Sequence, residues 1–397
     1  MTAISVQVFG RTDVGRTREH NEDAFVVADL TRDNATLQPE VRTHALGPKG
    51  SLFMVADGMG GAAAGEIASA MAIETVLEEM RVRWITGASE DAEAFAAAIR
   101  DACVEANARI HRYAAERPEH RGMGSTATIC GLLGDRLFLA QVGDSRAYLV
   151  RNGMAQQITK DQSLVQKLVE AGELTVEEAE LSERRNIILQ ALGPEARVKV
   201  DLTSQQVRRG DTLVLCSDGL SGQVKPAVIA RVVAEVPDLG EACRQLIDLA
   251  NEAGGPDNIT VVVARFEGEG LARTGHTDEV GHQVFRFSGA SRETVPADPD
   301  APTPPMGIPV VDPSRPTAKL TPRSVEALPP EAAPDPSAGE SSAPSPAAGA
   351  PAVAPAVAPA VAPAVAPPAK RDATGLYLLV GAAFIVVSAV FALLFRR

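Results

Sequence analysis

The sequence has few cysteines. Its 397 residues include four, Cys103, Cys130, Cys216 and Cys243, and they are widely spaced. None forms a Cys-x-x-Cys pair or stands near a histidine at zinc-binding spacing, which argues against a disulfide framework and a cysteine-ligated zinc site. All four lie in apolar helical or strand contexts, so the sequence predicts buried free thiols in a reducing compartment.

Basic clusters are also missing from the first 268 residues, and the whole chain has a net charge of −13 and a pI of about 5.1. A surface of this kind releases few phosphate counter-ions, so we expect no nucleic-acid partner. The acidity is compatible with a cation site and equally with simple solubility. The opening residues, MTAISVQVFGRTD, have no basic stretch followed by an apolar core, so we expect no secretory signal.

Glycine is absent from CVEANAR (103–109), which matches the Cys-x5-Arg pattern of cysteine-based phosphatases. Those enzymes need a glycine-rich loop whose free backbone N–H groups surround the phosphate. These seven residues instead lie in a helical run, where the backbone donors are used inside the helix. The sequence therefore argues against a catalytic role for Cys103.

Composition divides the chain into a globular part (1–268), a Pro- and Ala-rich part (269–373) and a C-terminal apolar part (374–397). The repeat PAVAPAVAPAVAPAVAPP (351–368) has proline at every fourth position, which disfavours helix and sheet, so we expect a disordered linker. Residues 376–395 form a run of 20 without charge, about the length that spans a bilayer. We expect a single-pass C-terminal anchor, with the globular domain in the cytoplasm.

Four aspartates stand where a predicted strand meets a loop that contains glycine. They follow SLFMVA, DTLVLCS and LFLAQVG or precede ITVVVARF: Asp57, Asp218, Asp144 and Asp257. Carboxylates held at rigid strand ends suit Mg²⁺ or Mn²⁺, and glycine lets other oxygen ligands approach. A single Asp-Gly pair is more often an ordinary turn, so the spacing alone leaves both interpretations open.

A further cluster lies near the start, in TDVGRTREHNEDAF (12–25). Arg18 offers a planar fork that suits a phosphate. The adjacent Glu22 and Asp23, just before the predicted strand AFVVADL, are placed to bind metal-held waters. This element favours the cation-site interpretation of the four aspartates.

Together these motifs resemble the metal-dependent serine/threonine protein phosphatases of type 2C, in their bacterial form. The resemblance covers about residues 5–266 and rests on DVGRTREHNED, FMVADGMGG, MGSTAT, VGDSRAY, LVLCSDGL and GGPDNITVVVA, in that order. It also accounts for residues 158–179 and 185–193, which look like the family's flap beside the active site. The implied fold is α+β, a four-layer αββα sandwich of two antiparallel sheets flanked by helix pairs. Helical periodicity at 65–85, 91–116, 226–235 and 239–253 agrees.

The resemblance implies a pair of Mn²⁺ or Mg²⁺ ions in a cleft at one end of the sandwich. Asp57 would bridge both ions, Gly58 would contribute its backbone carbonyl, and Asp218 and Asp257 would complete one ion's shell. A water that bridges the two ions would attack phosphorus in line, without a covalent phosphoenzyme.

The resemblance also assigns roles to four other residues. Glu22 and Asp23 would act at the second ion or its waters, and Asp144 matches the position of a third, weaker metal in bacterial members. Arg18 would bind the substrate phosphate, and with the ions would offset charge on its non-bridging oxygens.

The sequence departs from some relatives at four positions. Met59 stands where many eukaryotic members carry a histidine proposed as general acid, and methionine cannot donate a proton. His20 is a weak candidate for that role, because a solvated loop histidine is the simpler interpretation. Gln162 replaces a common histidine of the flap, and Leu189-Gln190 replaces a usual Thr-Arg, so flap contacts and substrate choice are in doubt.

The resemblance therefore implies a phosphatase that acts on phosphoserine and phosphothreonine in phosphorylated proteins, such as the substrates of bacterial serine/threonine kinases. With the apolar run, the expected location is the inner membrane, single-pass, with a cytoplasmic catalytic domain. Two alternatives stay open: a catalytically weak phosphatase-fold module that binds a signalling partner at the membrane, and a phosphatase dedicated to one anti-sigma-pathway protein.

Overall fold

The computed structural model describes residues 3–32, 42–60, 64–275 and 278–288. The chain divides into two compact units, Met1–Thr303 and Pro304–Arg397. The second unit lies wholly outside the described residues, and so do the proline repeat and the apolar run at 376–395. Within the ranges that are described, no helix is both long enough and apolar enough to cross a bilayer.

The first sheet is antiparallel, with strand order β3-β1-β12-β11-β8-β9. Its strands are β1 (Ile4–Asp13), β3 (Arg42–Ala45), β8 (Arg146–Arg151), β9 (Met154–Gln157), β11 (Thr212–Cys216) and β12 (Ile259–Gly268). The N-terminal strand β1 therefore lies beside β12, so residues more than 240 positions apart in the sequence pair directly.

The second sheet is also antiparallel, with order β10-β7-β6-β4-β2, and a short strand β5 pairs with the end of β4. Its strands are β2 (Asp23–Asp29), β4 (Ser51–Met59), β5 (Gly124–Ser125), β6 (Ala127–Leu133), β7 (Arg136–Val142) and β10 (Asp201–Gln206). β4 runs on through Asp57 and Gly58 because Gly58 and Met59 pair with β5, although the sequence predicts that this strand stops at Ala56.

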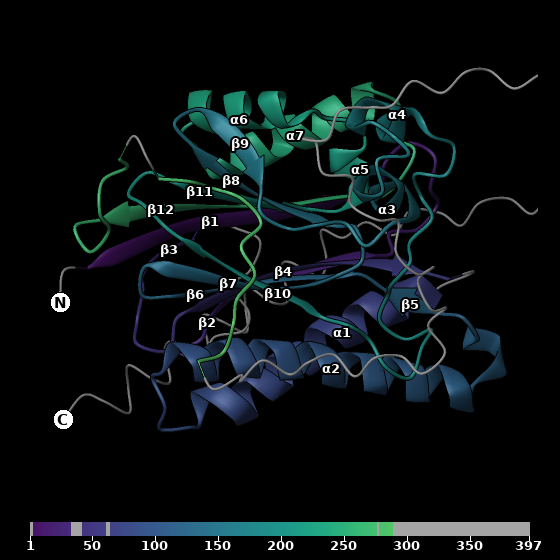
Figure 1. The fold of residues 1–397 in the computed structure, drawn as a ribbon, viewed down its shortest axis with the longest axis horizontal. Coiled ribbons are helices and arrows are strands. Elements are labelled where there is room, and N and C mark those ends of the chain that lie inside the picture. The colour runs from purple at the N-terminus through teal and green to yellow at the C-terminus, as the bar shows by residue number, and fades with distance from the viewer. Residues whose placement is uncertain (1–2, 33–41, 61–63, 276–277, 289–397) are drawn as a thin grey trace, which may run out of the picture. The chain divides into compact units, whose positions relative to one another are not determined.

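Two helix pairs cover the outer faces of the sheets (Figure 1). On the second sheet lie α1 (Ala64–Met80), which continues into a π-helical turn (Arg81–Ile85), and α2 (Ala92–Glu116). On the first sheet lie α6 (Pro226–Glu235) and α7 (Leu239–Glu252). The side chain of Asp91 accepts a hydrogen bond from the Ala94 N–H and caps α2. These helices confirm the four predicted from periodicity.

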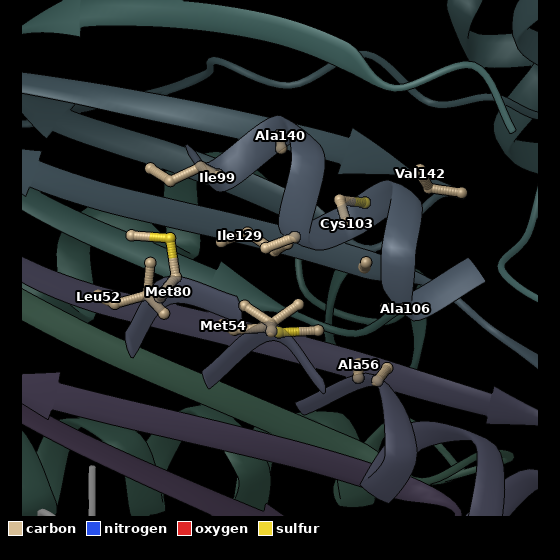
Figure 2. Packing of buried hydrophobic residues seen from close by; sticks show 14 of the residues in the cluster. Leu52, Met54, Ala56, Met80, Ile99, Cys103, Ala106, Ile129, Ala140 and Val142 are labelled. Atoms are coloured by element: carbon tan, nitrogen blue, oxygen red, sulfur yellow. The ribbon is translucent and has the colours of Figure 1, made fainter. Parts of the chain in front are cut away.

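Successive side chains along each strand point to opposite faces of its sheet. The apolar ones form three cores, one between each pair of neighbouring layers of the sandwich. On β4, Leu52 and Met54 join the core under α1 and α2, whereas Phe53 and Val55 join the core between the sheets. Figure 2 shows the first of these cores, where Leu52, Met54 and Ala56 of β4 lie beside residues of α1 and α2. A third core lies between the first sheet and α6 and α7. The expected αββα sandwich is confirmed.

Residues 278–288, called the strap below, extend the packed region beyond the domain end expected at 268. Arg208 donates two hydrogen bonds to the Asp278 carboxylate, at 2.7 and 3.1 Å. The strap then pairs antiparallel with β10, where the Phe285 N–H donates to Leu202 O and the Ser204 N–H to Gln283 O, both at 2.9 Å. The strap therefore covers the open edge of the second sheet.

The side chains of the strap continue the core. Phe285 lies edge-on to Phe138 of β7 and to Phe287, with ring centroids 5.3 Å apart in both pairs. The Arg100 guanidinium of α2 lies over the Phe287 ring, and the Ser288 N–H donates to the Glu93 carboxylate. Figure 1 shows this green segment running across the edge of the second sheet to α2. Residues 278–288 are therefore packed on the domain, although composition placed them in the expected linker.

Candidate active site

The structure brings together the six carboxylates expected to act at the ions, called the carboxylate cluster below: Glu22, Asp23, Asp57, Asp144, Asp218 and Asp257. They come from both sheets. Asp23 begins β2 and pairs with Asp57 near the end of β4, Asp144 follows β7, Asp218 follows β11, and Asp257 precedes β12. Antiparallel strands from two sheets thus deliver their ends to one edge of the sandwich.

A buried hydrogen bond between Ser217 and Asp23 helps to join the two sheets at this edge. Ser217, next after β11 in the first sheet, donates from Oγ to Asp23 Oδ2 at 2.7 Å, in the second sheet. The same Oγ accepts from the Thr260 N–H at 3.0 Å. Ser217 is fully buried, so the bond fixes the position of the Asp23 carboxylate relative to both sheets.

The backbone around Asp57 is held from several directions. The Asp57 N–H donates to Thr126 Oγ1, and the Asp57 carbonyl accepts from the Thr126 N–H and from Ser125 Oγ, at 2.8–3.0 Å. A Cβ on Gly58 would lie 2.2 Å from the Gly65 carbonyl oxygen and 2.6 Å from that of Glu22. Only glycine fits there, because the backbone of Gly65 and of Glu22 approaches Gly58 this closely.

Glycine also makes room for the Glu22 carboxylate. A Cβ on Gly65 would lie 2.7 Å from Glu22 Oε1, so the first turn of α1 approaches this carboxylate closely. Burial raises the pKa of Glu22, while the nearby Arg18 guanidinium and a hydrogen bond from the Gly65 backbone lower it. The Gly58 N–H donates to Glu22 O at 3.1 Å, which fixes the Glu22 backbone to the Asp57-Gly58 turn.

Asn258 organises the N-terminal loop, a role that no local sequence pattern indicates. Its side-chain oxygen accepts from the Glu22 N–H at 2.8 Å, and its amide nitrogen donates to Val14 O and His20 O at 3.0 and 2.9 Å. Asn258 is 4% exposed, so one buried amide satisfies three backbone groups of a loop 236 or more residues away. His20 itself is exposed, as a solvated loop histidine would be.

Arg18, the expected phosphate-binding residue, forms an ion pair with Asp257. Arg18 Nη2 lies 2.9 Å from Asp257 Oδ2, with the two side chains 50% and 29% exposed. This hydrogen bond, partly opposed by desolvation, raises the pKa of the guanidinium, and the charges of Asp257, Glu22 and Asp57 raise it further. Arg18 is therefore placed at the cluster and balances part of its negative charge.

The cluster is electrostatically unfavourable as a set of charged groups. Burial raises the pKa of Asp57 well above its ordinary value, and the charges of Asp23 and Asp218 raise it further. Burial likewise raises the pKa of Asp23 to about 7 and that of Asp144 to about 8, with Asp218 and Asp161 adding to the latter. The pKa of Asp218 is raised as well, first by burial. These carboxylates need cations or protons to share the space.

The donor set fits hard divalent cations. Within the described part of the chain, Asp23 Oδ1, Asp144 Oδ1 and Asp218 Oδ1 are buried and have no hydrogen-bond partner. Carboxylate oxygens are what Mg²⁺ and Mn²⁺ prefer, and a buried unpartnered oxygen is costly unless something binds it. No three His, Cys, Asp or Glu side chains among the described residues stand close enough to hold an ion as they are. An ion would therefore require the side chains to draw together.

The flap is fastened to the turn that carries Asp144. The Gln162 N–H donates to Gly143 O at 2.9 Å, and Gln162 Oε1 accepts from the Gly143 N–H at 3.0 Å. The Gln162 carbonyl accepts from the Leu189 N–H, so the same residue also holds the returning end of the flap. Between these ends lie α3 (Leu164–Glu170) and α4 (Val176–Leu181). The expected flap is thus adjacent to the cluster, and Gln162 uses its amide to hold it.

Asn107 of α2, also missed from the sequence, holds the loop that follows the flap. Its Oδ1 accepts from the Gly193 N–H at 2.8 Å, and its Nδ2 donates to Glu195 O at 3.0 Å. One residue before Gly193, Leu192 pairs with Ser125, which itself donates to the Asp57 carbonyl. A hydrophobic-face pattern could not reveal this, because it marks Asn107 only as a polar residue in a helix.

Cys103 has no catalytic environment. It is fully buried inside α2, and burial raises the pKa of its thiol to about 12. The thiolate is therefore unavailable near neutral pH. All four cysteines are free and buried, as the sequence predicts.

Comparison with known proteins gives consistent matches. A family model described as protein phosphatase 2C matches residues 31–252. The serine/threonine phosphatase stp of Listeria monocytogenes is 38% identical over 253 residues, covering 64% of this chain and 93% of that protein. The serine/threonine protein phosphatase PstP of Mycobacterium tuberculosis is 38% identical over 258 residues, covering 64% of this chain and 44% of PstP.

Solved structures agree with the sequence matches. The crystal structure of the Mycobacterium tuberculosis serine/threonine phosphatase PstP/Ppp has 36% sequence identity and a TM-score of 0.54, covering 66% of this chain and 99% of that one. A structure of the PstP catalytic domain in complex with two manganese ions has 35% identity and a TM-score of 0.54, with the same coverage of both chains.

Proposed function

Because the chain belongs to the protein phosphatase 2C family of metal-dependent serine/threonine phosphatases, we propose that it hydrolyses phosphoserine and phosphothreonine at the carboxylate cluster with two Mn²⁺ or Mg²⁺ ions. The observation that carries this proposal is the convergence of six carboxylates from both sheets, three of them with a buried oxygen that has no partner within the described residues. The two manganese ions of the related PstP structure support the same ion count.

Each member of the cluster has a role in this proposal. Asp57 would bridge the two ions, the Gly58 carbonyl would bind one of them, and Asp218 and Asp257 would complete a shell. When bound, the ions would make a shared water acidic and neutralise charge on the phosphate. The hydrogen bonds that Asp57 makes with Thr126 and Ser125 hold this end of β4, so it need not reorganise during turnover.

The remaining residues would serve the substrate and the outer ligands. Arg18 would bind the non-bridging phosphate oxygens through its planar fork. Glu22 and Asp23 would orient water at the second ion, with Asp23 fixed by Ser217. Asp144 would hold a third ion. Met59 cannot protonate the leaving alcohol, so we assign that step to solvent within the cluster.

The test is phosphate release from a phosphothreonine peptide by the full chain, with Mn²⁺, with Mg²⁺ and with chelator. We expect cation-dependent release that Asp218→Asn reduces by at least a hundredfold, because the substitution removes a charged ligand without changing its size. Release that persists in chelator would refute the metal-dependent mechanism. A folded chain that releases no phosphate with either cation would instead favour the catalytically weak binding module.

We also propose that residues 376–395 anchor the protein in the inner membrane, with the phosphatase domain in the cytoplasm and phosphorylated proteins there as its substrates. The support is the sequence alone, a charge-free run of 20 residues after a proline-rich spacer. The spacer would raise the local concentration of the domain near membrane-bound substrates. Removal of residues 304–397 should then slow turnover of a vesicle-bound phosphoprotein and leave a soluble phosphopeptide unaffected. If the truncated chain turned over the vesicle-bound phosphoprotein as fast as the full chain does, the anchor would be refuted.

A further inference from the structure

Asp257 differs from Asp23, Asp144 and Asp218 in having both carboxylate oxygens engaged. Its Oδ2 accepts from Arg18 Nη2 at 2.9 Å, and its Oδ1 accepts from the Asn258 N–H at 2.9 Å. Asp218, expected in the same ligand shell, has an oxygen with no partner among the described residues. A cation that approaches the cluster therefore meets a free oxygen on Asp218 but a guanidinium already bound to Asp257.

The backbone that carries Arg18 is fixed to the loop that carries Asp257. The Arg16 N–H and Thr17 Oγ1 both donate to Gly255 O, at 2.8 and 2.9 Å. Gly15 has φ of 81°, and a Cβ there would lie 2.1 Å from the Asp257 carbonyl oxygen. The two loops are thus in close contact up to the residue before Arg18, so Arg18 can leave Asp257 only by rotation of its own side chain.

The Arg18 side chain has space for that rotation, because half of its surface is exposed. Its guanidinium is attracted by Glu22 and Asp57 as well as by Asp257, so it serves as a counter-ion inside the cluster. A divalent cation bound at Asp257 would replace Arg18 on the same oxygen and would repel the guanidinium as a like charge. The displaced Arg18 guanidinium would then be free to bind an anion beside the carboxylate cluster.

We propose that Arg18 is a latch on Asp257, which holds the ligand oxygen until a divalent cation binds and then turns to the substrate phosphate. The inference rests on the proposed function and adds an order of binding to it, with the cation before the phosphoester. It also assigns Arg18 two partners in sequence, a carboxylate in the metal-free enzyme and a phosphate in the loaded one.

The first test is calorimetric titration of Mn²⁺ into the full chain, in the absence of substrate. Arg18→Ala removes the competing cation and should tighten Mn²⁺ binding by about two- to fivefold, the range that partly exposed ion pairs contribute. The matched control is Arg16→Ala, which removes a positive charge two residues away and leaves the Arg18–Asp257 pair in place. Its affinity should stay within about 1.5-fold of the unaltered chain.

The second test measures the reactivity of Arg18 with phenylglyoxal, read from the modified peptide by mass spectrometry. We expect slow modification in chelator, faster modification with Mg²⁺, and protection again when inorganic phosphate is added with Mg²⁺. Phosphate without Mg²⁺ should change little, because the guanidinium is then still bound to Asp257.

Two of the possible outcomes separate the latch from the phosphatase activity. Equal Mn²⁺ affinity of Arg18→Ala and Arg16→Ala, or Arg18 reactivity that ignores Mg²⁺, would overturn the latch while peptide hydrolysis could still proceed. Tighter Mn²⁺ binding by Arg18→Ala, with Mg²⁺-dependent reactivity in a chain that hydrolyses no phosphopeptide, would uphold the latch and refute the proposed function. A chain that binds no Mn²⁺ would overturn both.

Discussion

Raising the pH from 5 to 8 should destabilise the metal-free chain, because buried carboxyl groups of the cluster must then ionise beside one another. Burial raises the pKa of Asp23 to about 7 and that of Asp144 to about 8, from an ordinary value of 3.8. The folded state thus keeps protons that the unfolded chain has already released. The stabilisation is complete below pH 3.8 and is lost as the pH rises through the folded pKa values, so the free energy of unfolding falls.

The size of the effect follows from the pKa values. Between pH 5 and its folded pKa of about 7, Asp23 keeps a proton that the unfolded chain has lost. Over these two pH units the free energy of unfolding falls by roughly 3 kcal/mol. Asp144 alone, with a pKa of about 8, gives about 4 kcal/mol over the same range, and the two figures do not add in full, because each carboxylate also interacts with Asp218. The expected loss for the whole cluster is therefore at least about 4 kcal/mol, a large part of the stability of an ordinary domain.

The assay is urea unfolding of the full chain in chelator at several pH values, followed by the fluorescence of Trp84, the single tryptophan, which is buried against Phe95. Saturating Mg²⁺ should abolish the pH dependence, because it replaces the protons as the source of positive charge. Asp144→Asn should remove part of the dependence in chelator. A metal-free stability that stays flat or rises between pH 5 and 8 would refute the reasoning.

Two further predictions concern stability away from the cluster. Phe285→Ala should lower the free energy of unfolding by about 2 kcal/mol, because it removes the edge contact to Phe138 and the apolar area that the ring buries. The control is Val284→Ala, at a side chain that is 57% exposed, which should change the free energy of unfolding by less than about 0.5 kcal/mol. Equal losses in chemical denaturation would mean that the strap is not packed as described. Arg151→Met should cost about 3–5 kcal/mol, because Asp211, 1% exposed, would keep the Arg208 N–H but lose its charged partner at 2.6 Å. Adding Asp211→Leu should recover part of the loss, and no recovery would contradict this account.

Local sequence pattern predicted the strands that position the candidate site residues, whereas the metal-binding and catalytic roles of those residues stay predictions. Asp57 and Asp218 each follow an apolar strand and precede a glycine, Asp257 follows a Gly-Gly-Pro turn before another strand, and those strands form in the structure. The helix Pro226–Glu235 begins at a proline in its first turn and has the predicted bounds. Such features depend on residues close together in the chain, which a sequence pattern can record.

The rest of the site depends on contacts between distant residues. Nothing local distinguishes Asn258 from the polar residue of a turn, yet its amide holds a loop 236 or more positions away. The ion pair of Arg18 with Asp257 likewise joins two motifs that the sequence suggested for separate roles, phosphate and metal binding. The roles of these residues in catalysis stay predictions until ligands are measured.

The strap was missed because its surroundings in the sequence are poor in apolar residues. Phe285 and Phe287 alternate around an arginine, a pattern typical of a half-buried strand, but Pro and Ala dominate the residues that follow. Composition averaged over a long window concealed a short segment that packs against β10 and α2.

The way the strap is attached decides how the phosphatase domain responds to a pull on its C-terminal side. Traction at Ser288 would load the contact with Glu93 first, then the Phe287 ring, and then the two backbone hydrogen bonds to β10, one after another. Bonds broken in succession resist far less than bonds loaded together, so the strap would peel away before tension reached β12. Asp257 and Asn258 directly precede β12 in the chain. Detachment of the strap would therefore keep a pulling force from reaching β12 and the carboxylate cluster.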